Sequence, residues 1–301
     1  MILVVGATGR LGGMIAHRLL EQGQDVRILV RQNSPSEQMA QQGLATSAKA
    51  LIAAGAQPVQ GDLKDAGSLP AAVAGVTTVI TTANSVLRGG EDNVQHVDRE
   101  GNRRLVDAAA AAGVAHFIFI TGLGAALDSP NDFMRAKAET ERHLRASGMD
   151  FTSIAPDAFS EVWPGMVVGM PVLQSRPVTL VGEGRRRYTF IAIQDVAAFA
   201  VAAVDNPLAR NQYLALGGPE ALSWRDVVAT YERVLGREIQ VNWIKPGEMV
   251  PGLPEGMWTI LTGMEAYDSI VPMEGTAAAY DVTLTPLESF ARLQTSSLVG
   301  S

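Results

Sequence analysis

The first 21 residues place a short apolar strand directly before a glycine-spaced turn and an amphipathic helix. The strand is expected over Ile2–Val5, the turn carries Gly6, Gly9 and Gly12, and the helix follows over residues 14–21. In this pattern the first glycine permits a tight turn, the second lets backbone amides approach a pyrophosphate, and the third allows close helix packing. Because the positive end of the helix then faces the anion, the sequence predicts a dinucleotide site rather than a plain glycine-rich turn.

The residue that follows the second expected strand bears on the choice of dinucleotide. A site selective for NAD normally places Asp or Glu about 20 residues beyond the glycines, where it binds the ribose 2′-hydroxyl. Here Arg31 follows the strand Val26–Val30, with no carboxylate beside it. A guanidinium can hold a 2′-phosphate through two hydrogen bonds, and Arg10 in the turn can flank the same group. The two arginines favour NADP(H), the alternative being that both are solvated surface charges.

Composition limits the classes of protein and of partner. A chain of 301 residues with 47% apolar residues exceeds the usual size of one domain and can build a large core. A net charge of −7 and a pI of about 5.2 disfavour nucleic acid or an anionic membrane as partners. The absence of cysteine excludes disulfides and thiolate chemistry, and the four histidines lack metal-ligand spacing, so no metal is expected. No apolar stretch approaches about 18 residues, which indicates a cytoplasmic, soluble protein with no leader before Ile2.

Apolar runs alternate with helical segments through the first half of the chain, which is typical of a parallel α/β sheet. We therefore expect a Rossmann-type doubly wound parallel sheet in residues 1–155, and a smaller C-terminal α/β substrate region in residues 156–301. Asp195 is expected to cap a helix that returns to the Rossmann core around residues 190–215. The expected strands after the second cover residues 57–60, 78–82, 116–121 and 151–155.

Polar residues follow these strands where ligands of open parallel sheets bind. Asp62 follows the third strand and is a candidate for the adenine amine, while Thr82 and Asn84 follow the fourth, beside the phosphates and ribose. Each of them also suits a turn or cap for local reasons. Their shared position on one edge of the sheet favours ligand contact.

The glycine turn in the sequence GATGRLGG, Arg31, the GDL tripeptide at residues 61–63, and Lys137 with Glu141 before the FTSIAP segment resemble the NmrA-like family. This is an atypical branch of the short-chain dehydrogenase/reductase superfamily. The resemblance spans nearly the whole chain and implies an NADP(H)-binding Rossmann domain with a small substrate region. The residues then expected to bind the cofactor are Gly6, Thr8, Gly9, Arg10, Leu11, Gly12, Arg31, Asp62, Leu63, Thr82, Ala83, Asn84, Thr121, Gly122, Lys137, Pro156 and Phe159.

One helix departs from the superfamily pattern. Short-chain dehydrogenases generally carry Tyr and Lys four residues apart on one helical face, where the Tyr exchanges a proton and the Lys binds the ribose. This chain keeps Lys137 but has Phe133 at the Tyr position, so a tyrosine acid is ruled out there. Two chemistries remain. In one, Lys137 or water held by it donates the proton to a conjugated acceptor, and in the other a quinone or cationic dye gains the hydride and can take its proton from solvent. The alternative for Lys137 is a helix-surface ammonium paired with Glu141.

These patterns predict an NADPH-dependent reductase that transfers hydride to a quinone-like, dye-like or conjugated carbonyl compound. The rival hypothesis is a catalytically silent NADP(H) sensor that acts through a protein partner, since the resemblance includes members of that kind. Phe133 favours the sensor, whereas Lys137 and a Trp-rich second region favour an enzyme with an organic substrate. A homodimer is compatible with either hypothesis.

Overall fold

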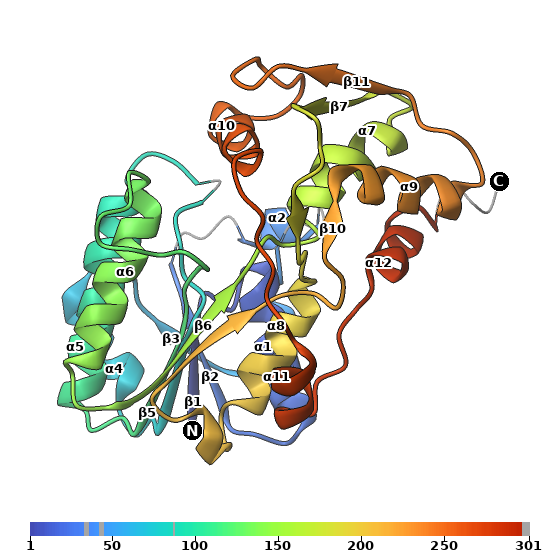
Figure 1. Ribbon diagram of the computed structural model, residues 1–301. Helices are drawn as coiled ribbons and strands as arrows, with labels where there is room; N and C mark the ends of the chain where they lie inside the picture. The colour runs from blue at the N-terminus through green and yellow to red at the C-terminus, as the bar shows by residue number, and fades with distance from the viewer. Residues whose placement is uncertain (33–35, 42–44, 87, 297–301) are drawn as a thin grey trace. The chain divides into compact units, whose positions relative to one another are not determined.

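The computed structural model describes residues 1–32, 36–41, 45–86 and 88–296. It divides into two compact units, one of residues 1–155 and 196–215 and the other of residues 156–195 and 216–301. The first unit is therefore built from two separate parts of the chain, and Figure 1 labels the helices and strands of both units.

A seven-stranded sheet of order β3-β2-β1-β4-β5-β6-β9 organises the first unit. The register of its first six strands is parallel throughout, with Leu3 opposite both Arg27 and Val79. This is the α/β Rossmann-like fold that the alternating pattern predicts. The strands are β1 (Ile2–Val5), β2 (Val26–Val30), β3 (Gln57–Gln60), β4 (Thr78–Thr81), β5 (His116–Ile120), β6 (Asp150–Pro156) and β9 (Gln212–Leu216).

Helices cover both faces of this sheet (Figure 1), with α4, α5 and α6 on one side and α1 and α8 on the other. Alternate strand residues such as Leu3, Val79 and Phe117 are fully buried against the α4–α6 face. Strands buried on both faces read as continuous apolar runs, which is why they were readable from the sequence. The elements here are α1 (Arg10–Glu21), α2 (Ser36–Gln41), α3 (Ala48–Ala53), η1 (Ala66–Ser68), α4 (Leu69–Val73), the π-helix η2 (Val94–Gly101), α5 (Asn102–Ala111), α6 (Asp132–Arg145), α8 (Ile193–Ala202) and η4 (Pro207–Ala209).

The return of the chain to the sheet differs in one detail from the prediction. Helix α8 begins at Ile193, so Asp195 lies in its first turn and does not cap it. Its carboxylate instead accepts hydrogen bonds from the backbone N–H and the hydroxyl of Thr285, each at 2.7 Å. The carboxylate that was expected to cap the helix therefore binds Thr285, 90 positions later in the chain. No local sequence pattern predicts such a long-range partner.

The second unit has a core of its own, in which Trp224, Tyr188 and Tyr231 are fully buried. Helix α9 fills it, beginning with a capping box between Ser223 and Asp226. No helix within the described ranges has the length and apolar character needed to cross a membrane. The elements of this unit are η3 (Pro164–Gly169), α7 (Met170–Leu173), β7 (Val178–Val181), β8 (Arg187–Tyr188), β10 (Leu222–Ser223), α9 (Trp224–Leu235), β11 (Val241–Ile244), α10 (Glu255–Met264), α11 (Glu274–Ala279) and α12 (Leu287–Gln294).

Candidate functional site

The turn after β1 is so tight that two of its glycines tolerate no side chain. Gly6 has a φ of +86°, and a Cβ there would lie 2.5 Å from Thr82 Oγ1. A Cβ on Gly12 would lie 2.3 Å from the carbonyl oxygen of Gly6. Gly9 donates its N–H to that same oxygen at 2.9 Å, which closes the turn. We call this turn, residues 6–13, the cradle. Its glycines let the backbone come close to a ligand, as binding of a pyrophosphate requires.

Helix α1 starts within this cradle with an uncapped amino terminus. Gly9 is its N-cap residue and contributes no side chain, and its first turn carries no acidic residue. Arg10 is exposed there, while Thr8 and Leu11 are half-buried on either side. The first N–H groups of a helix have no intrahelical partner, so this end of α1 offers donors and a positive dipole to an anion.

Thr46 is a contact of the cradle that sequence reasoning missed. Its N–H donates to the carbonyl of Thr8 at 3.0 Å, and its hydroxyl donates to the carbonyl of Gly9 at 3.3 Å. A Cβ on Gly13 would overlap the same hydroxyl, at 1.9 Å. The absence of a side chain at Gly13 therefore allows Thr46 to contact the turn. No sequence pattern near residue 46 predicts this contact.

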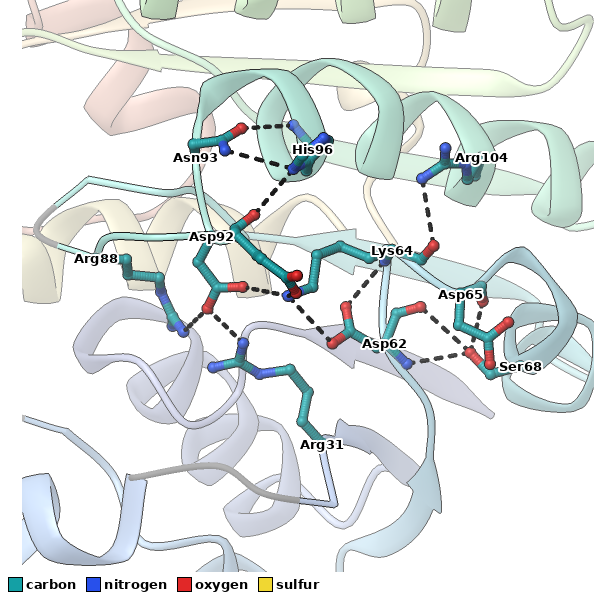
Figure 2. A network of polar contacts seen from close by, with 11 residues as sticks. Arg31, Asp62, Lys64, Asp65, Ser68, Arg88, Asp92, Asn93, His96 and Arg104 are labelled. Atoms are coloured by element: carbon teal, nitrogen blue, oxygen red, sulfur yellow. Dashed lines mark hydrogen bonds and ion pairs between the residues drawn. The ribbon is translucent and has the colours of Figure 1, made fainter.

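Arg31 belongs to a cluster of charges at the carboxyl ends of the strands, shown in Figure 2. Its Nη1 lies 2.5 Å from Asp92 Oδ2, and Lys64 Nζ lies 2.8 Å from Asp92 Oδ1. Arg88 Nη1 approaches Asp92 Oδ2 at 3.5 Å. We call Arg31, Lys64, Arg88 and Asp92 the Asp92 cluster. Its side chains are 17–38% exposed, so all four remain in contact with water.

The Asp92 cluster corrects one expectation from the sequence. No carboxylate was expected to compete for Arg31, because none stands near it in the chain, yet Asp92 does so from 61 positions away. Although partial burial alone raises the pKa of Asp92, hydrogen bonds from Lys64 and Arg31 lower it to about 2. The hydrogen bond to Asp92 in turn raises the pKa of Lys64. The cluster is thus fully charged at neutral pH.

The predicted residues after β3 and β4 lie on the same edge but are largely engaged locally. Asp62 Oδ1 accepts the backbone N–H of Lys64 at 2.9 Å, and Leu63 is buried in the core beneath. Asn84 Nδ2 donates to the carbonyl of Thr82 at 3.2 Å. Ala83 is half-buried beside them. For Asp62 and Asn84 the turn role is therefore visible in the structure, and their contact with a cofactor stays a prediction.

Lys137 on α6 is buried, which excludes the alternative of a helix-surface ammonium. Its side chain is 3% exposed, and its Nζ donates to the carbonyl of Ile120, the last residue of β5, at 3.1 Å. The ammonium also lies 4.9 Å and 5.3 Å from the ring centroids of Phe119 and Phe133. The phenyl ring at the position of the missing tyrosine therefore contacts the ammonium instead of exchanging a proton with it.

Two buried carboxylates accompany this ammonium. Asp98 Oδ1 lies 4.0 Å from Lys137 Nζ, and Asp98 Oδ2 accepts the N–H of Ser85 at 3.0 Å. Glu141 accepts a hydrogen bond from Thr121 Oγ1 at 2.5 Å, so Thr121 positions this acid and Lys137 is not its hydrogen-bonding partner. We call Lys137, Asp98 and Glu141 the Lys137 cluster. Asp98 comes from η2, and no spacing in the sequence pointed to it.

Burial dominates the protonation of the Lys137 cluster. It lowers the pKa of Lys137, against the opposing field of Asp98 and Glu141. It raises the pKa of Asp98 and the pKa of Glu141, since a dry environment disfavours each charged form. An ammonium with a lowered pKa gives up its proton more readily than an exposed lysine does. The cluster can therefore act as a proton donor.

The remaining predicted residues fall at the ends of β5 and β6. Gly122 follows Thr121, and a Cβ there would lie 3.3 Å from Met134 Cε of α6. Pro156 is the last residue of β6, and Phe159 forms an isolated parallel bridge with Ile191 in the second unit. Pro156 thus ends a strand and Phe159 lies three residues beyond it, while the contact of both with a cofactor stays a prediction.

The second unit contains an apolar hollow of about 380 Å³. A volume of this order is typical of small-molecule sites. Asp157 accepts a hydrogen bond at 3.1 Å from the hydroxyl of Thr189, which lines this hollow, and burial raises the pKa of Asp157. The hollow is lined by Thr189, Gly218, Pro219, Ala221, Ile270, Val271, Pro272, Met273, Glu274 and Leu284.

Comparison with known proteins extends these local features to the whole chain. Residues 1–285 match the model of the NmrA-like family. The chain is 30% identical over 300 residues to an NAD(P)H azoreductase of Xenophilus azovorans, covering 97% of this chain and 96% of that one. A quinone oxidoreductase of Escherichia coli complexed with NADPH has a TM-score of 0.79 at 21% identity, covering 97% of this chain and 99% of that one. The triphenylmethane reductase of Citrobacter sp. complexed with NADP(H) also has a TM-score of 0.79, at 19% identity, covering 98% of this chain and 100% of that one. The chain belongs to the NmrA-like family.

Proposed function

We propose that this protein is an NADPH-dependent oxidoreductase that reduces a quinone-like, dye-like or conjugated carbonyl compound. Support for the reaction class comes from the azoreductase, which matches almost end to end. A (4-alkanoyl-5-oxo-2,5-dihydrofuran-3-yl)methyl phosphate reductase of Streptomyces griseus is also 31% identical, covering 80% of this chain and 76% of that one. The azoreductase, the quinone oxidoreductase and the triphenylmethane reductase are named for azo, quinone and triphenylmethane compounds.

The residues of the first unit fit NADP(H). A side chain at Gly6 would clash with Thr82 and one at Gly12 with the carbonyl of Gly6, so only glycines allow this turn, whose backbone amides can approach a pyrophosphate. The amino terminus of α1 faces the same anion, and Arg31 is one of three cations at the neighbouring strand ends. These groups bind and orient the dinucleotide, whose nicotinamide supplies the hydride. A preference for NADP(H) follows from the phosphate-binding chemistry of the cations.

Lys137 is the residue that we propose completes the reduction. A quinone, azo compound or enone that gains a hydride must also gain a proton, and the ammonium of Lys137 can deliver one from Nζ, directly or through water. A cationic triphenylmethane dye is neutralised by the hydride alone and needs no proton. Burial of Lys137, which lowers its pKa, favours that transfer. Solvent then restores the proton on Nζ. The observation that carries the proposal is this ammonium, held dry at the carboxyl end of β5 where the superfamily places its catalytic lysine.

The test is the loss of nicotinamide absorbance from NADPH across a panel of quinones, azo and triphenylmethane dyes, and enones. Wild type is compared with Lys137→Ala and a protein-free blank. Lys49→Ala is the matched control, because Lys49 is an exposed lysine of the same unit. We expect saturable turnover with at least one acceptor, lost in Lys137→Ala and kept in Lys49→Ala. A protein that binds NADPH but consumes none above the blank contradicts the proposal.

A further inference from the structure

Three cationic side chains surround the carboxylate of Asp92. Figure 2 shows Arg31 and Arg88 converging on its Oδ2 while Lys64 reaches Oδ1. Two further carboxylates, Asp62 and Glu91, approach only Lys64, at 4.0 Å and 3.8 Å. Asp92 is therefore the carboxylate on which all three cations meet.

Three cationic donors around one anionic group form the environment that a phosphate dianion takes. Guanidinium groups bind phosphate and carboxylate through the same paired N–H geometry, so either anion satisfies Arg31. The cations come from the end of β2, from the turn after β3 and from the segment after β4. This edge of a parallel sheet is where the adenosine ribose of a dinucleotide binds. Asp92 thus occupies the coordination that a 2′-phosphate needs.

We propose that Asp92 determines the choice between NADPH and NADH by competing with the 2′-phosphate for Arg31, Lys64 and Arg88. With NADH, the carboxylate keeps its cations and can accept a hydrogen bond from the ribose 2′-hydroxyl, as the acidic residue of NAD-selective sites does. With NADPH, the phosphate displaces the carboxylate from the cations. The chain therefore uses both cofactors, and Asp92 reduces its preference for the phosphorylated one. This inference rests on the dinucleotide binding proposed above.

The competition has a direction that can be measured. Asp92→Asn keeps the size of the side chain but removes the charge, so the three cations become available to phosphate. Since a hydrogen bond to a charged group is worth more than a neutral one, we expect NADPH to bind about tenfold more tightly. For NADH the charged acceptor of the 2′-hydroxyl is replaced by a neutral amide oxygen, so NADH is expected to bind about threefold more weakly. The ratio of the two dissociation constants then shifts about thirtyfold.

Glu91→Gln supplies the matched control. It removes one negative charge at the adjacent position, from a side chain that is 89% exposed and 3.8 Å from Lys64 but contacts neither arginine in the cluster. A nonspecific effect of net charge would change NADPH binding equally in both variants. Lys64→Met added to Asp92→Asn should cancel most of the gain for NADPH and leave NADH unchanged. The double variant therefore tests whether the gain in NADPH affinity depends on the cations of the Asp92 cluster.

The experiment is calorimetric titration of wild type and the variants with NADPH, NADH, adenosine 2′,5′-bisphosphate and AMP. The two fragments differ by the 2′-phosphate, so the shift should recur with them if that group is the competitor. Unchanged ratios in Asp92→Asn, or equal shifts in Glu91→Gln, overturn the role of Asp92 alone. Weaker NADPH binding in Asp92→Asn also overturns it, by showing that the carboxylate orients Arg31 for the phosphate. A wild type that binds none of the four ligands overturns the proposed function as well.

Discussion

The two charged clusters of the first unit use the same kinds of side chain in opposite surroundings. The Asp92 cluster has side chains 17–38% exposed, with hydrogen-bonded ion pairs. The Lys137 cluster has Lys137 and Asp98 at 3% and 0% exposure, separated by 4.0 Å without a direct hydrogen bond. Ionisable groups in contact with water stay charged and can bind an anion. Burial shifts the pKa of an ionisable group in the direction that favours its neutral form. The extent of burial, more than the residue type, distinguishes Lys64, which we propose binds an anion, from Lys137, which we propose transfers a proton.

The sharpest test exchanges the two lysines for the same apolar residue. Lys137→Met should lower kcat by about a hundredfold to a thousandfold, because it removes the proton donor while leaving the turn that binds cofactor. Lys64→Met should leave kcat nearly unchanged and weaken NADPH by about tenfold, because it removes one cation from the phosphate site. Steady-state kinetics with saturating acceptor and direct titration with NADPH separate the two effects. If both variants changed kcat alike, the distinction between the clusters would be lost.

The cradle can be tested without touching any charge. Gly12→Ala should weaken NADPH by at least about a hundredfold, because the new methyl group must displace the carbonyl of Gly6. Gly263→Ala is the control, since a Cβ at this position of α10 meets open space. Titration and thermal unfolding of both variants distinguish local distortion of the turn from general instability. Unaltered NADPH affinity in a folded Gly12→Ala protein contradicts the assignment of the cradle.

The buried imidazole of His116, elsewhere in the first unit, should make the stability of the protein depend on pH. His116 Nε2 lies 2.8 Å from Thr152 Oγ1, whose own hydrogen goes to the carbonyl of Ala209, so the ring must donate. Burial, aided by the charge of Arg210, lowers the pKa of His116 from 6.5 to about 4. The unfolded chain thus binds an extra proton between these values, and stability falls as the pH drops through that window.

At pH about 4.5 this imidazole should cost about 2.5 kcal/mol of the free energy of unfolding, relative to neutral pH. Denaturant unfolding of wild type and His116→Gln at several pH values measures it, and the variant should lose that part of the pH dependence. His143→Gln, at a side chain that is 33% exposed, should retain it. Identical pH profiles for wild type and His116→Gln would show that the ring is not held neutral.

The smallest expected effect distinguishes the clusters by salt. Raising the ionic strength from about 0.05 to about 0.5 M shortens the range of exposed charges severalfold, so NADPH affinity should fall about threefold more than NADH affinity. The value of kcat at saturating substrates should stay constant, because Lys137 is screened by protein and not by ions. Equal salt dependence for the two cofactors would argue that no cation binds the 2′-phosphate.

Local patterns were sufficient to predict most of the scaffold. The first strand and Arg31 directly after β2 lie where they were predicted, whereas α1 begins at Arg10, four residues before its expected start. The ends of the six expected strands agree within one residue, which buried apolar runs explain for most of them but not for the exposed, polar β3, and the seventh strand, β9, was not predicted. The family resemblance, based on the same motifs, was confirmed over residues 1–285.

The electrostatic partners were not predictable in the same way. Asp92 meets Arg31 across 61 positions, and Asp98 meets Lys137 from the π-helix η2, 39 positions earlier in the chain. Thr46 likewise reaches the glycine turn from a segment that precedes α3. Single acids and hydroxyls between elements are read as turn or cap residues, since that is their commonest role. Only the folded chain shows which of them face a charge.

The order of the sheet also has a consequence for how the chain is made. Strand β9, which lies beside β6, is synthesised about 60 residues after it, a delay of roughly 3 to 12 seconds at ordinary elongation rates. Until then the nascent sheet ends at β6, whose unpaired backbone groups invite pairing with other chains. A fragment that stops at residue 155 keeps that exposed edge permanently. During translation, β6 therefore stays at the edge of the sheet until residues 212–216 have been synthesised and can pair with it.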